Sequence, residues 1–221
     1  MLARGILFDF NGVIAHDEAL HFEALSATLA AHGISLTREQ YYADFLGLND
    51  RECFRRSFEA AGRTPDKFTL QHAVEQKADI YEDIARARLE LVAGVRDFIE
   101  AASAARMVLG VASSALKREV EFVLQMKSLR EHFETIVSAE EVERCKPDPQ
   151  TFERARQRLR LAREECVVIE DSLPGIEAAR AGGFRCVAIA SSLPADALAG
   201  ADMVWADFGG HHPADLPWAD A

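Results

Sequence analysis

Three apolar runs of this chain end in side chains that can do chemistry: Asp9, Ser113-Ser114 and Glu170-Asp171. A short apolar run that ends in polar or turn-forming residues is typical of a strand buried in a parallel sheet. Because parallel strands present their carboxyl ends at one edge of the sheet, we expect these side chains to lie together. Each residue alone also suits a turn or a helix cap. Their shared position at strand ends favours a ligand site.

The charges of these residues indicate what such a site would hold. Asp9, Glu170 and Asp171 would repel one another and raise one another's pKa values without a cation. Carboxylate oxygens with a main-chain carbonyl are ligands that Mg²⁺ prefers. Lys146, just ahead of a predicted helix, adds a point positive charge. Together with the Ser113-Ser114 donors, these groups would form a local cationic pocket for an anionic substrate on a chain of net charge −11.

Strands and helices alternate from Val92 onward, which predicts a parallel sheet with right-handed crossovers. The predicted strands are Gly5–Phe10, Met107–Ala112, Thr135–Val137, Cys166–Ile169, Cys186–Ile189 and Met203–Trp205. The predicted helices between them are Gly94–Ala104, Leu116–Met126, Pro149–Leu161 and Gly175–Ala181. The fold class is therefore α/β, with a Rossmann-like parallel-sheet core and helices on both faces.

The stretch between the first two core strands is helical and too long for an ordinary crossover. Its predicted helices are Asp17–His32, Thr37–Leu46, Asp50–Ala61 and Phe68–Leu91, separated by Gly33, Gly47, Gly62 and Pro65. We expect residues 15–91 to form an inserted all-helical cap domain, a lid over the end of the first strand. Residues 1–14 and 92–221 then form the catalytic core.

Composition excludes several classes of protein. No apolar run approaches the length of about 18 residues that spans a membrane, and we expect no export signal at the N-terminus. The net charge of −11 argues against nucleic-acid binding. Four scattered cysteines, Cys53, Cys145, Cys166 and Cys186, predict reduced thiols in a cytoplasmic protein. The tail from Gly209 to Ala221, with His211 and His212, is expected to be loosely ordered.

The motifs as a set resemble the haloacid dehalogenase-like hydrolase superfamily, and most closely its β-phosphoglucomutase-like phosphatases with a helical cap. The matching stretches are FDFNGVI at 8–14, VASS at 111–114, CKPDP at 145–149 and IEDSLPGIEAARAGG at 169–183. The resemblance implies an Mg²⁺-dependent phosphatase of a small phosphorylated metabolite that works through a phospho-Asp9 intermediate. It also implies that Ser113 and Lys146 hold the phosphoryl group, with Ser114 beside it. The implied Mg²⁺ ligands are Asp9, the main-chain carbonyl of Asn11, Glu170 and Asp171.

The chain departs from the family pattern at Asn11, where the phosphatases usually carry a second aspartate that protonates the leaving oxygen and activates water. An amide cannot cycle a proton, and general acid–base catalysis is worth roughly 10²–10⁴-fold. Three accounts stay open. Asn11 is an engineered substitution that traps the enzyme, another group such as His16 or His21 takes the role, or the chemistry needs no protonated alkoxide.

The predicted cap carries the candidate substrate contacts. By the resemblance, the loop Leu46–Arg51 matches the family's specificity loop, with Gly47 and Arg51 as contacts, and His21 matches a cap position that mutases also fill with histidine. A histidine on a helix face is also a common packed or solvated residue. β-Phosphoglucomutases have lysine where this chain has Leu46, which weakens a mutase assignment.

Other functions compete with the phosphatase. A sugar-phosphate mutase would require a bisphosphate primer, and a dehalogenase would leave Glu170-Asp171 without a purpose. A phosphonate hydrolase would need a cap lysine, for which Lys67 and Lys77 are the candidates. A catalytically weak phosphometabolite-binding protein is favoured by Asn11 alone. We expect a monomer, with a dimer as the alternative.

Overall fold

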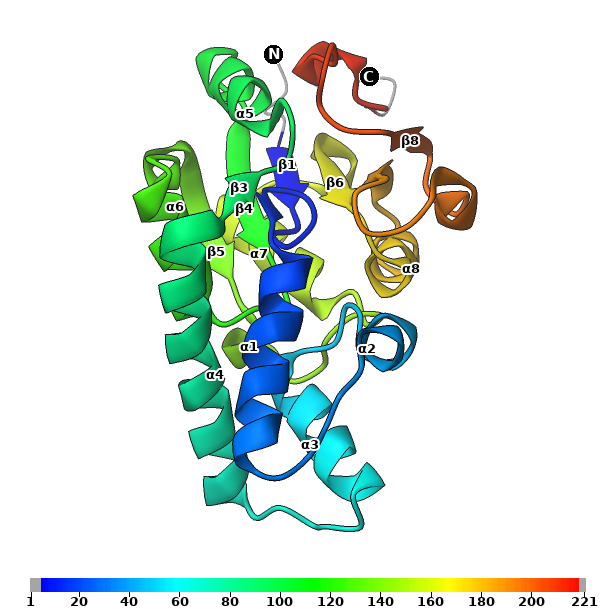
Figure 1. The fold of residues 1–221 in the computed structure, drawn as a ribbon. Helices are drawn as coiled ribbons and strands as arrows, with labels where there is room; N and C mark the ends of the chain where they lie inside the picture. Colours follow the sequence, from blue (N-terminus) through cyan, green and yellow to red (C-terminus); the bar gives the residue numbers. More distant parts are fainter. Residues whose placement is uncertain (1–4, 219–221) are drawn as a thin grey trace. The chain divides into compact units, whose positions relative to one another are not determined.

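A six-stranded parallel sheet forms the centre of the larger part of the computed structural model, which describes residues 5–218 (Figure 1). Its strands are β1 (Gly5–Phe8), β4 (Val108–Ala112), β5 (Phe133–Val137), β6 (Cys166–Glu170), β7 (Arg185–Ile189) and β8 (Met203–Trp205). They lie in the order β5-β4-β1-β6-β7-β8, and every neighbouring pair is parallel. The predicted α/β fold with a parallel core is confirmed.

The interior position of β1 follows from its composition. All residues of β1 are buried, so the strand has no solvent-facing side. Leu7 belongs to an apolar cluster on one face of the sheet, with Phe152 of α7 (Gln150–Leu159) and Ile176 of α8 (Leu173–Ala181). Phe8 points to the other face and packs edge-on against Phe98. Asp9, the next residue, therefore follows a strand that is fixed from both faces.

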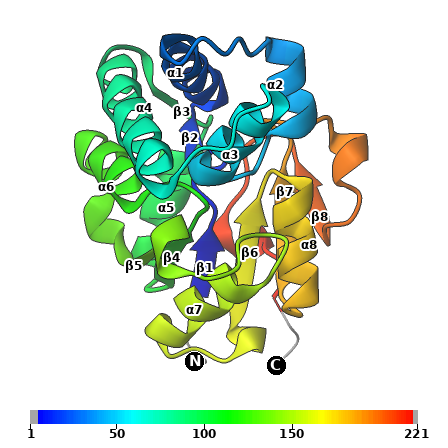
Figure 2. The same cartoon turned by 90° about the horizontal axis from the view of Figure 1, so that it is seen from below.

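Helices cover both faces of the sheet. α7 and α8 pack on the Leu7 face, and Figure 2 shows α8 alongside β6 and β7. α5 (Val95–Ala104) covers the Phe8 face, where Phe98 lies among Phe8, Trp205 and Phe208. α6 (Lys117–Met126) follows β4 and buries Val120, Val123 and Leu124. Because helices cover both faces of the sheet, a ligand site can form only at the ends of the strands.

One strand pair was not expected. The sequence predicts helices throughout 15–91, but β2 (Ala15–His16) and β3 (Glu90–Leu91) pair as a short antiparallel ladder. The predicted helix to Leu91 accordingly ends at Arg88. Two-residue strands carry no detectable alternation of apolar and polar residues, so the pairing depends on contacts between distant segments.

The chain divides into two compact units, each described here by itself. One comprises the residues up to His16 together with those from Glu90 onward, and the other is Asp17–Leu89. The helical unit contains α1 (Glu18–Ala31), α2 (Arg38–Asp44), α3 (Asp50–Ala60) and α4 (Lys67–Arg88). The side chains of Thr37, Asn49 and Asp66 cap α2, α3 and α4. That this unit acts as a cap stays a prediction.

The prediction of a loosely ordered tail is wrong for residues 209–218. The ring of His211 stacks on Trp205, with centroids 4.1 Å apart and planes within 5°. Pro213 and Leu216 are buried, and the indole N–H of Trp218 donates to the carbonyl of Pro213. The expected tail residues 219–221 lie outside the described residues. Aromatic stacking on β8 orders this segment. The local composition of the segment does not predict this stacking.

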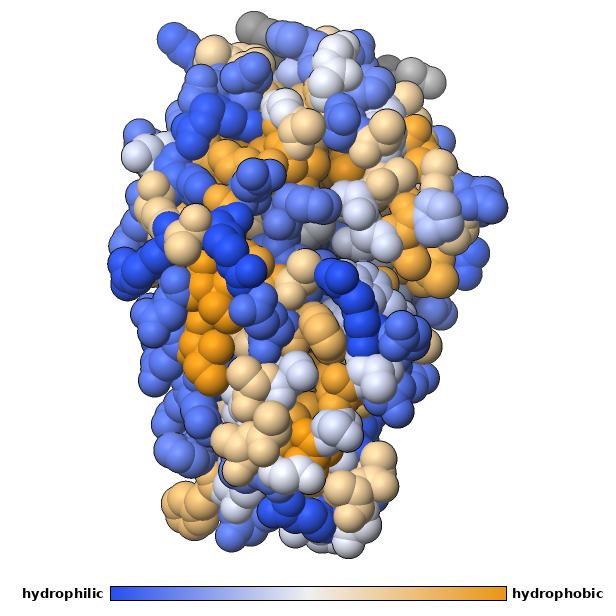
Figure 3. All heavy atoms as spheres, viewed as in Figure 1, coloured by the Kyte–Doolittle hydropathy of each residue, from blue (hydrophilic) through white to orange (hydrophobic). Residues whose placement is uncertain are grey.

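Polar and charged side chains cover much of the face drawn in Figure 3, with apolar side chains between them. Among the described residues, the large exposed hydrophobic side chains are Phe68 and Leu173. No helix in residues 5–218 is both long and apolar enough to cross a membrane.

The aromatic cluster on the Phe8 face should be a main source of stability. We expect Phe98→Ala to lower the free energy of unfolding by about 3–5 kcal/mol, because the truncation leaves a cavity among Phe8, Trp205 and Phe208. Urea denaturation measures the change. Phe68→Ala is the matched control, since Phe68 is 85% exposed and its loss should change stability by less than about 0.5 kcal/mol. Equal effects of the two substitutions would contradict this account of the core.

Candidate active site

Lys146 joins the ends of two strands that lie far apart in the sequence. Its ammonium group lies 2.7 Å from Asp9 Oδ1, just after β1, and 2.6 Å from Glu170 Oε1, at the end of β6. All three side chains are buried. The structure therefore brings together three of the predicted site residues at the carboxyl edge of the sheet, as the topology requires.

Contacts among its own residues and the start of α7 stabilise the loop that carries Lys146. The side-chain carbonyl of Gln150 accepts hydrogen bonds from the backbone N–H groups of Glu143 and Arg144, each at 2.8 Å. Arg144 also forms an ion pair with Asp148, and the Lys146 ammonium lies 4.7 Å from the ring centroid of Phe152. These contacts on both sides of Lys146 fix its reach toward Asp9.

Glu170 has protein donors on both carboxylate oxygens. Oε1 accepts from Lys146, while Oε2 accepts from the backbone N–H groups of Asp171 and Ser172 and from the Ser172 hydroxyl. A Cβ on Gly175, in the first turn of α8, would lie 1.8 Å from Glu170 Oε1. Glycine is thus required there so that the helix can approach the carboxylate. Glu170 is a fixed negative charge that holds Lys146.

The three carboxylates lie close enough to share one ion. Asp9, Glu170 and Asp171 each offer an oxygen within 4.8 Å of the others, and all are buried. Burial and, to a smaller extent, the Glu170 carboxylate raise the pKa of Asp9 to about 7, although the Lys146 ammonium opposes the shift. One lysine therefore does not compensate three buried carboxylates.

This donor set fits a divalent cation. A small cluster of carboxylate oxygens with an excess of negative charge is what Mg²⁺ prefers. Glu170 accepts hydrogen bonds on both of its oxygens, and Asp9 accepts one from Lys146 through Oδ1. The predicted metal role of Glu170 and that of the Asn11 carbonyl stay predictions.

The turn after Asp9 depends on Gly12. Gly12 has φ +70°, and a Cβ there would lie 1.8 Å from Asp171 Oδ2. The Gly12 N–H donates to the carbonyl of Ala15 at 2.7 Å. The Gly12 carbonyl accepts from the Ser191 hydroxyl. The turn that contains Asn11 is therefore anchored from β2 and from the segment after β7.

The two serines after β4 differ in their contacts. The Ser113 hydroxyl oxygen accepts from the Ala115 N–H at 3.0 Å, and the Ser113 N–H donates to the Val137 carbonyl. The buried Ser114 hydroxyl has no hydrogen-bond partner in residues 5–218. An unsatisfied buried hydroxyl is costly, so Ser114 is a donor that a bound ligand could use.

Several residues that organise the site were not predicted from the sequence: Gln150, Ser172 and Ser191. Ser191 follows a strand end at the same edge of the sheet, so the rule that selected Asp9 and Ser113 would also have selected it. Ser172 lies within the motif at 169–183, but the motif does not show that its hydroxyl donates to Glu170. Gln150 acts through backbone groups of a loop, for which the sequence holds no signal.

In the helical unit, both ring nitrogens of His21 are engaged. The Lys77 ammonium donates to Nδ1 at 2.7 Å, so Nε2 carries the proton and faces Asp17 at 3.3 Å. Lys77 also donates to Asp50 at 2.9 Å, and the Tyr81 hydroxyl donates to Asp17. This buried network joins α1, the start of α3 and α4.

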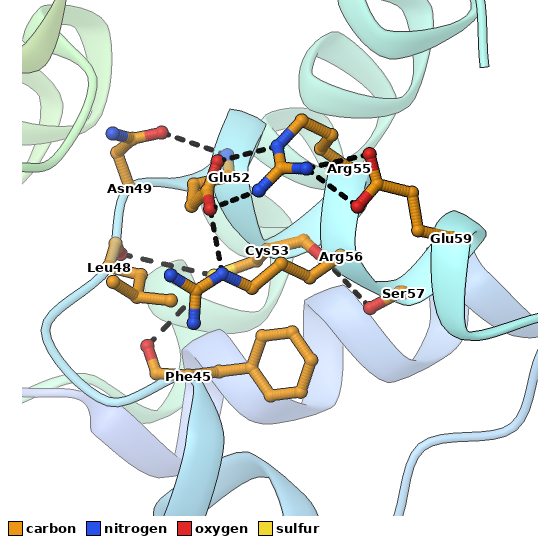
Figure 4. Close-up of polar contacts among 9 residues, drawn as sticks. All are labelled: Phe45, Leu48, Asn49, Glu52, Cys53, Arg55, Arg56, Ser57 and Glu59. Carbon is orange, nitrogen blue, oxygen red and sulfur yellow. Dashed lines mark hydrogen bonds and ion pairs between the residues drawn. The ribbon is translucent and has the colours of Figure 1, made fainter. Parts of the chain in front are cut away.

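The remaining predicted cap residues lie nearby in the same unit. Gly47 has φ +79° and is half-buried in the loop that ends with the helix cap Asn49. Figure 4 shows that Arg55 and Arg56 pair with glutamates of their own helix. Arg51 is exposed and has no such partner among the described residues, which leaves its guanidinium available. His16, the alternative proton carrier, is exposed in β2 opposite Glu90.

Comparison with known proteins identifies the family. Residues 6–189, most of the chain, match the model for haloacid dehalogenase-like hydrolases. The chain belongs to this family. The resemblance predicted from the four motifs is thereby confirmed, and it places the Asp9–Lys146–Glu170 constellation in a family of hydrolases.

One of the similar proteins is named as a phosphatase. The chain is 30% identical to the phosphorylated carbohydrates phosphatase of Thermotoga maritima over 82% of each chain. It is 29% identical to protein CbbY of Rhodobacter capsulatus, covering 94% of this chain and 92% of that protein.

Solved structures share the fold along nearly the whole chain. CbbY from Rhodobacter sphaeroides, in complex with phosphate, superposes with a TM-score of 0.88 at 28% identity, over 97% of this chain and 99% of that one. A β-phosphoglucomutase from Clostridium difficile has the same fold, with a TM-score of 0.85 at 18% identity over 96% and 95% of the two chains.

The buried network of the helical unit gives a test of its own. We expect Lys77→Met to lower the free energy of unfolding by about 1–3 kcal/mol, because it leaves His21 Nδ1 and the half-buried Asp50 carboxylate without the buried ammonium that donates to both. Denaturant unfolding followed by circular dichroism measures the effect. Lys67→Met, an exposed position on the same helix, is the control and should be nearly neutral. A neutral Lys77→Met would show that the network does not stabilise the unit.

Proposed function

We propose that the protein is an Mg²⁺-dependent phosphatase of a small phosphorylated carbohydrate, with Asp9 as the nucleophile. The observation that carries the proposal is the buried Asp9 carboxylate, which lies 2.7 Å from the Lys146 ammonium within a carboxylate cluster. Two relatives support the reaction class. The first, from Thermotoga maritima, is named as a phosphatase. The second, CbbY from Rhodobacter sphaeroides, was solved in complex with phosphate. A mutant of that second relative was solved with xylulose-(1,5)bisphosphate, which supports a sugar phosphate as substrate.

The proposed reaction has two halves. A carboxylate oxygen of Asp9 attacks phosphorus, the bond to the ester oxygen breaks, and the alcohol leaves after taking up a proton. Water then attacks the phosphoryl group, the bond between phosphorus and Asp9 breaks so that the Asp9 carboxylate is restored, and inorganic phosphate leaves with the protons of that water. Lys146, with the Ser113 and Ser114 groups, would hold the phosphoryl oxygens during both halves.

A divalent cation would complete the charge balance at this edge. Asp9 and Asp171, with the main-chain carbonyl of Asn11, would hold it, and Glu170 would keep Lys146 oriented. When bound, the cation would neutralise phosphoryl oxygens and keep Asp9 ionised.

The helical unit Asp17–Leu89 would act as the cap domain. Gly47 and Arg51 on its loop would contact the substrate, since Arg51 is the arginine of this stretch with no carboxylate partner among the described residues. His21, whose ring nitrogens both have partners inside the unit, would position the cap rather than carry protons.

Asn11 limits the proposed reaction, because the leaving alcohol and the attacking water both need a proton carrier. A catalytically weak protein that binds a phosphorylated metabolite is therefore the second candidate, and Asn11 is the observation that favours it. Activity measurements separate the two candidates.

Substitution of Asp9 tests the nucleophile. We expect Asp9→Asn to abolish Mg²⁺-dependent phosphate release from p-nitrophenyl phosphate, because an amide cannot form the acyl phosphate. Asp97→Asn, an exposed carboxylate of α5 outside the cluster, is the control and should retain most of the activity. Equal activity of Asp9→Asn and the parent protein would refute the assignment.

Leaving-group dependence tests the role of Asn11. An aryl phosphate releases a stable aryloxide, whereas an alkyl sugar phosphate needs a proton donor. We expect turnover of glucose 6-phosphate to rise roughly 10²-fold or more in Asn11→Asp, with a smaller gain on p-nitrophenyl phosphate. Comparable rates of the parent protein on both esters would show that another group supplies the proton.

The raised pKa of Asp9 predicts how Mg²⁺ binding depends on pH. Below about pH 7 the metal-free Asp9 is protonated, so the ion must displace a proton in order to bind. We expect the dissociation constant for Mg²⁺, measured by calorimetry, to rise by up to about tenfold per pH unit below 7 and to be constant above 8. In Asp9→Asn the binding should be weaker and should lose this slope. A dissociation constant for Mg²⁺ that does not change with pH in the parent protein would contradict the raised pKa of Asp9.

A further inference from the structure

We propose that the sheet unit carries a second ligand site, a pocket for a small phosphate monoester with an apolar part, at the edge of the sheet opposite Asp9. A cavity of about 490 Å³ lies there, within the range of pockets that hold metabolites of nucleotide size. The proposal concerns binding alone and does not depend on the proposed catalytic function.

The placement of the cavity separates it from the candidate active site. Its lining includes Arg185, the first residue of β7, and Asp202, which precedes β8. It also includes Arg163, at the start of the 3-10 turn (Arg163–Glu165) that leads into β6. These are the amino ends of parallel strands, whereas Asp9 and Asp171 follow carboxyl ends.

Three guanidinium groups from different elements line the cavity: Arg163, Arg180 and Arg185. Arg163 is held by Glu153 at 2.7 Å, and Arg185 by Asp202 at 2.7 Å. Arg180, in the last turn of α8, has no carboxylate partner within residues 5–218. A guanidinium offers paired N–H donors that match a phosphate group. This convergence occurs on a chain of net charge −11, so overall composition does not account for it.

The acidic residues that line the cavity do not prevent an anion from binding. Asp202 is already satisfied, because one oxygen accepts from Arg185 and the other from the Cys186 N–H at 2.8 Å. Glu164 is exposed. Because Glu153 pairs with Arg163 and Asp202 pairs with Arg185, Arg180 is the lining arginine best able to turn to a phosphate.

The floor of the cavity is apolar. Ile176 and Phe184 are buried, and the Arg163 guanidinium lies 5.8 Å from the Phe184 ring centroid. Burial raises the pKa of the Cys186 thiol above its usual value, so this lining group stays neutral. An apolar floor beneath cationic groups suits a ligand that joins a phosphate to an apolar or aromatic body.

Glycines leave the space open. Gly200 lines the cavity, and a Cβ built there would lie 3.3 Å from the Ile176 side chain. A larger side chain at this position would project toward the floor without any change of charge. Gly200→Val and Arg180→Gln therefore test the space and the charge separately.

The experiment measures binding of adenosine monophosphate by calorimetry to the full chain in EDTA, where the proposed metal-dependent reaction is silent. We expect Arg180→Gln and Gly200→Val each to weaken binding about tenfold or more, as the loss of a charge-assisted hydrogen bond or of the space predicts. Arg154→Gln, an exposed arginine of α7 outside the cavity, should bind like the parent protein. Inorganic phosphate and adenosine alone should each bind more weakly than the monophosphate.

Other results would overturn the proposal. They are absence of binding at millimolar monophosphate, equal binding of inorganic phosphate, and loss of binding in Ser114→Ala with no effect of Arg180→Gln, which would place the ligand at the candidate active site. Should Gly200→Val fail to fold, Arg180→Gln decides alone, because this exposed change leaves the core untouched.

Discussion

The charge balance at Lys146 is the constraint on which the rest of the site depends. One buried ammonium holds Asp9 and Glu170 at 2.7 and 2.6 Å, while Asp171 adds a third carboxylate within reach of the same ion. Burial, with the neighbouring Glu170 carboxylate, raises the pKa of Asp9 to about 7 although the Lys146 ammonium opposes the shift. Buried charges persist only when compensated, and a cation together with an anionic substrate would compensate this cluster in the proposed function. Protein donors hold both carboxylate oxygens of Glu170 in place.

The fold serves this arrangement by fixing each contributor from a different direction. β1 is buried on both faces and fixes the backbone that leads to Asp9. Gly175 allows α8 to approach the Glu170 carboxylate. The Gln150 side chain accepts hydrogen bonds from the loop that carries Lys146. Asn11 lies in a turn that Ala15 and Ser191 anchor through Gly12. The proposed nucleophile Asp9 and Asn11, which stands where the family resemblance implies a proton carrier, are therefore held in one local structure. This combination is why the leaving group should govern the rate in the proposed phosphatase.

Sequence patterns predicted the elements whose residues repeat, and the site residues whose position the topology dictates. The parallel strands and the convergence of Asp9, Lys146 and Glu170 follow from apolar runs and strand ends, and the structure shows both. What the sequence could not show depends on long-range pairing. β2 and β3 are too short for a periodic pattern, and the order of residues 209–218 comes from stacking of His211 on Trp205. The four donors to Glu170 and the partners of Lys77 likewise become visible only when distant segments are placed in space.

The covalent role of Asp9 is the central claim, and trapping the intermediate tests it most directly. The protein would be mixed with Mg²⁺ and p-nitrophenyl phosphate, quenched in acid during turnover, and digested for mass spectrometry. The account predicts one phosphoryl group on the peptide that contains Asp9, lost on treatment with hydroxylamine and absent from Asp9→Asn. Steady release of p-nitrophenol with an unmodified Asp9 peptide, or a phosphoryl group on a different residue, would contradict it.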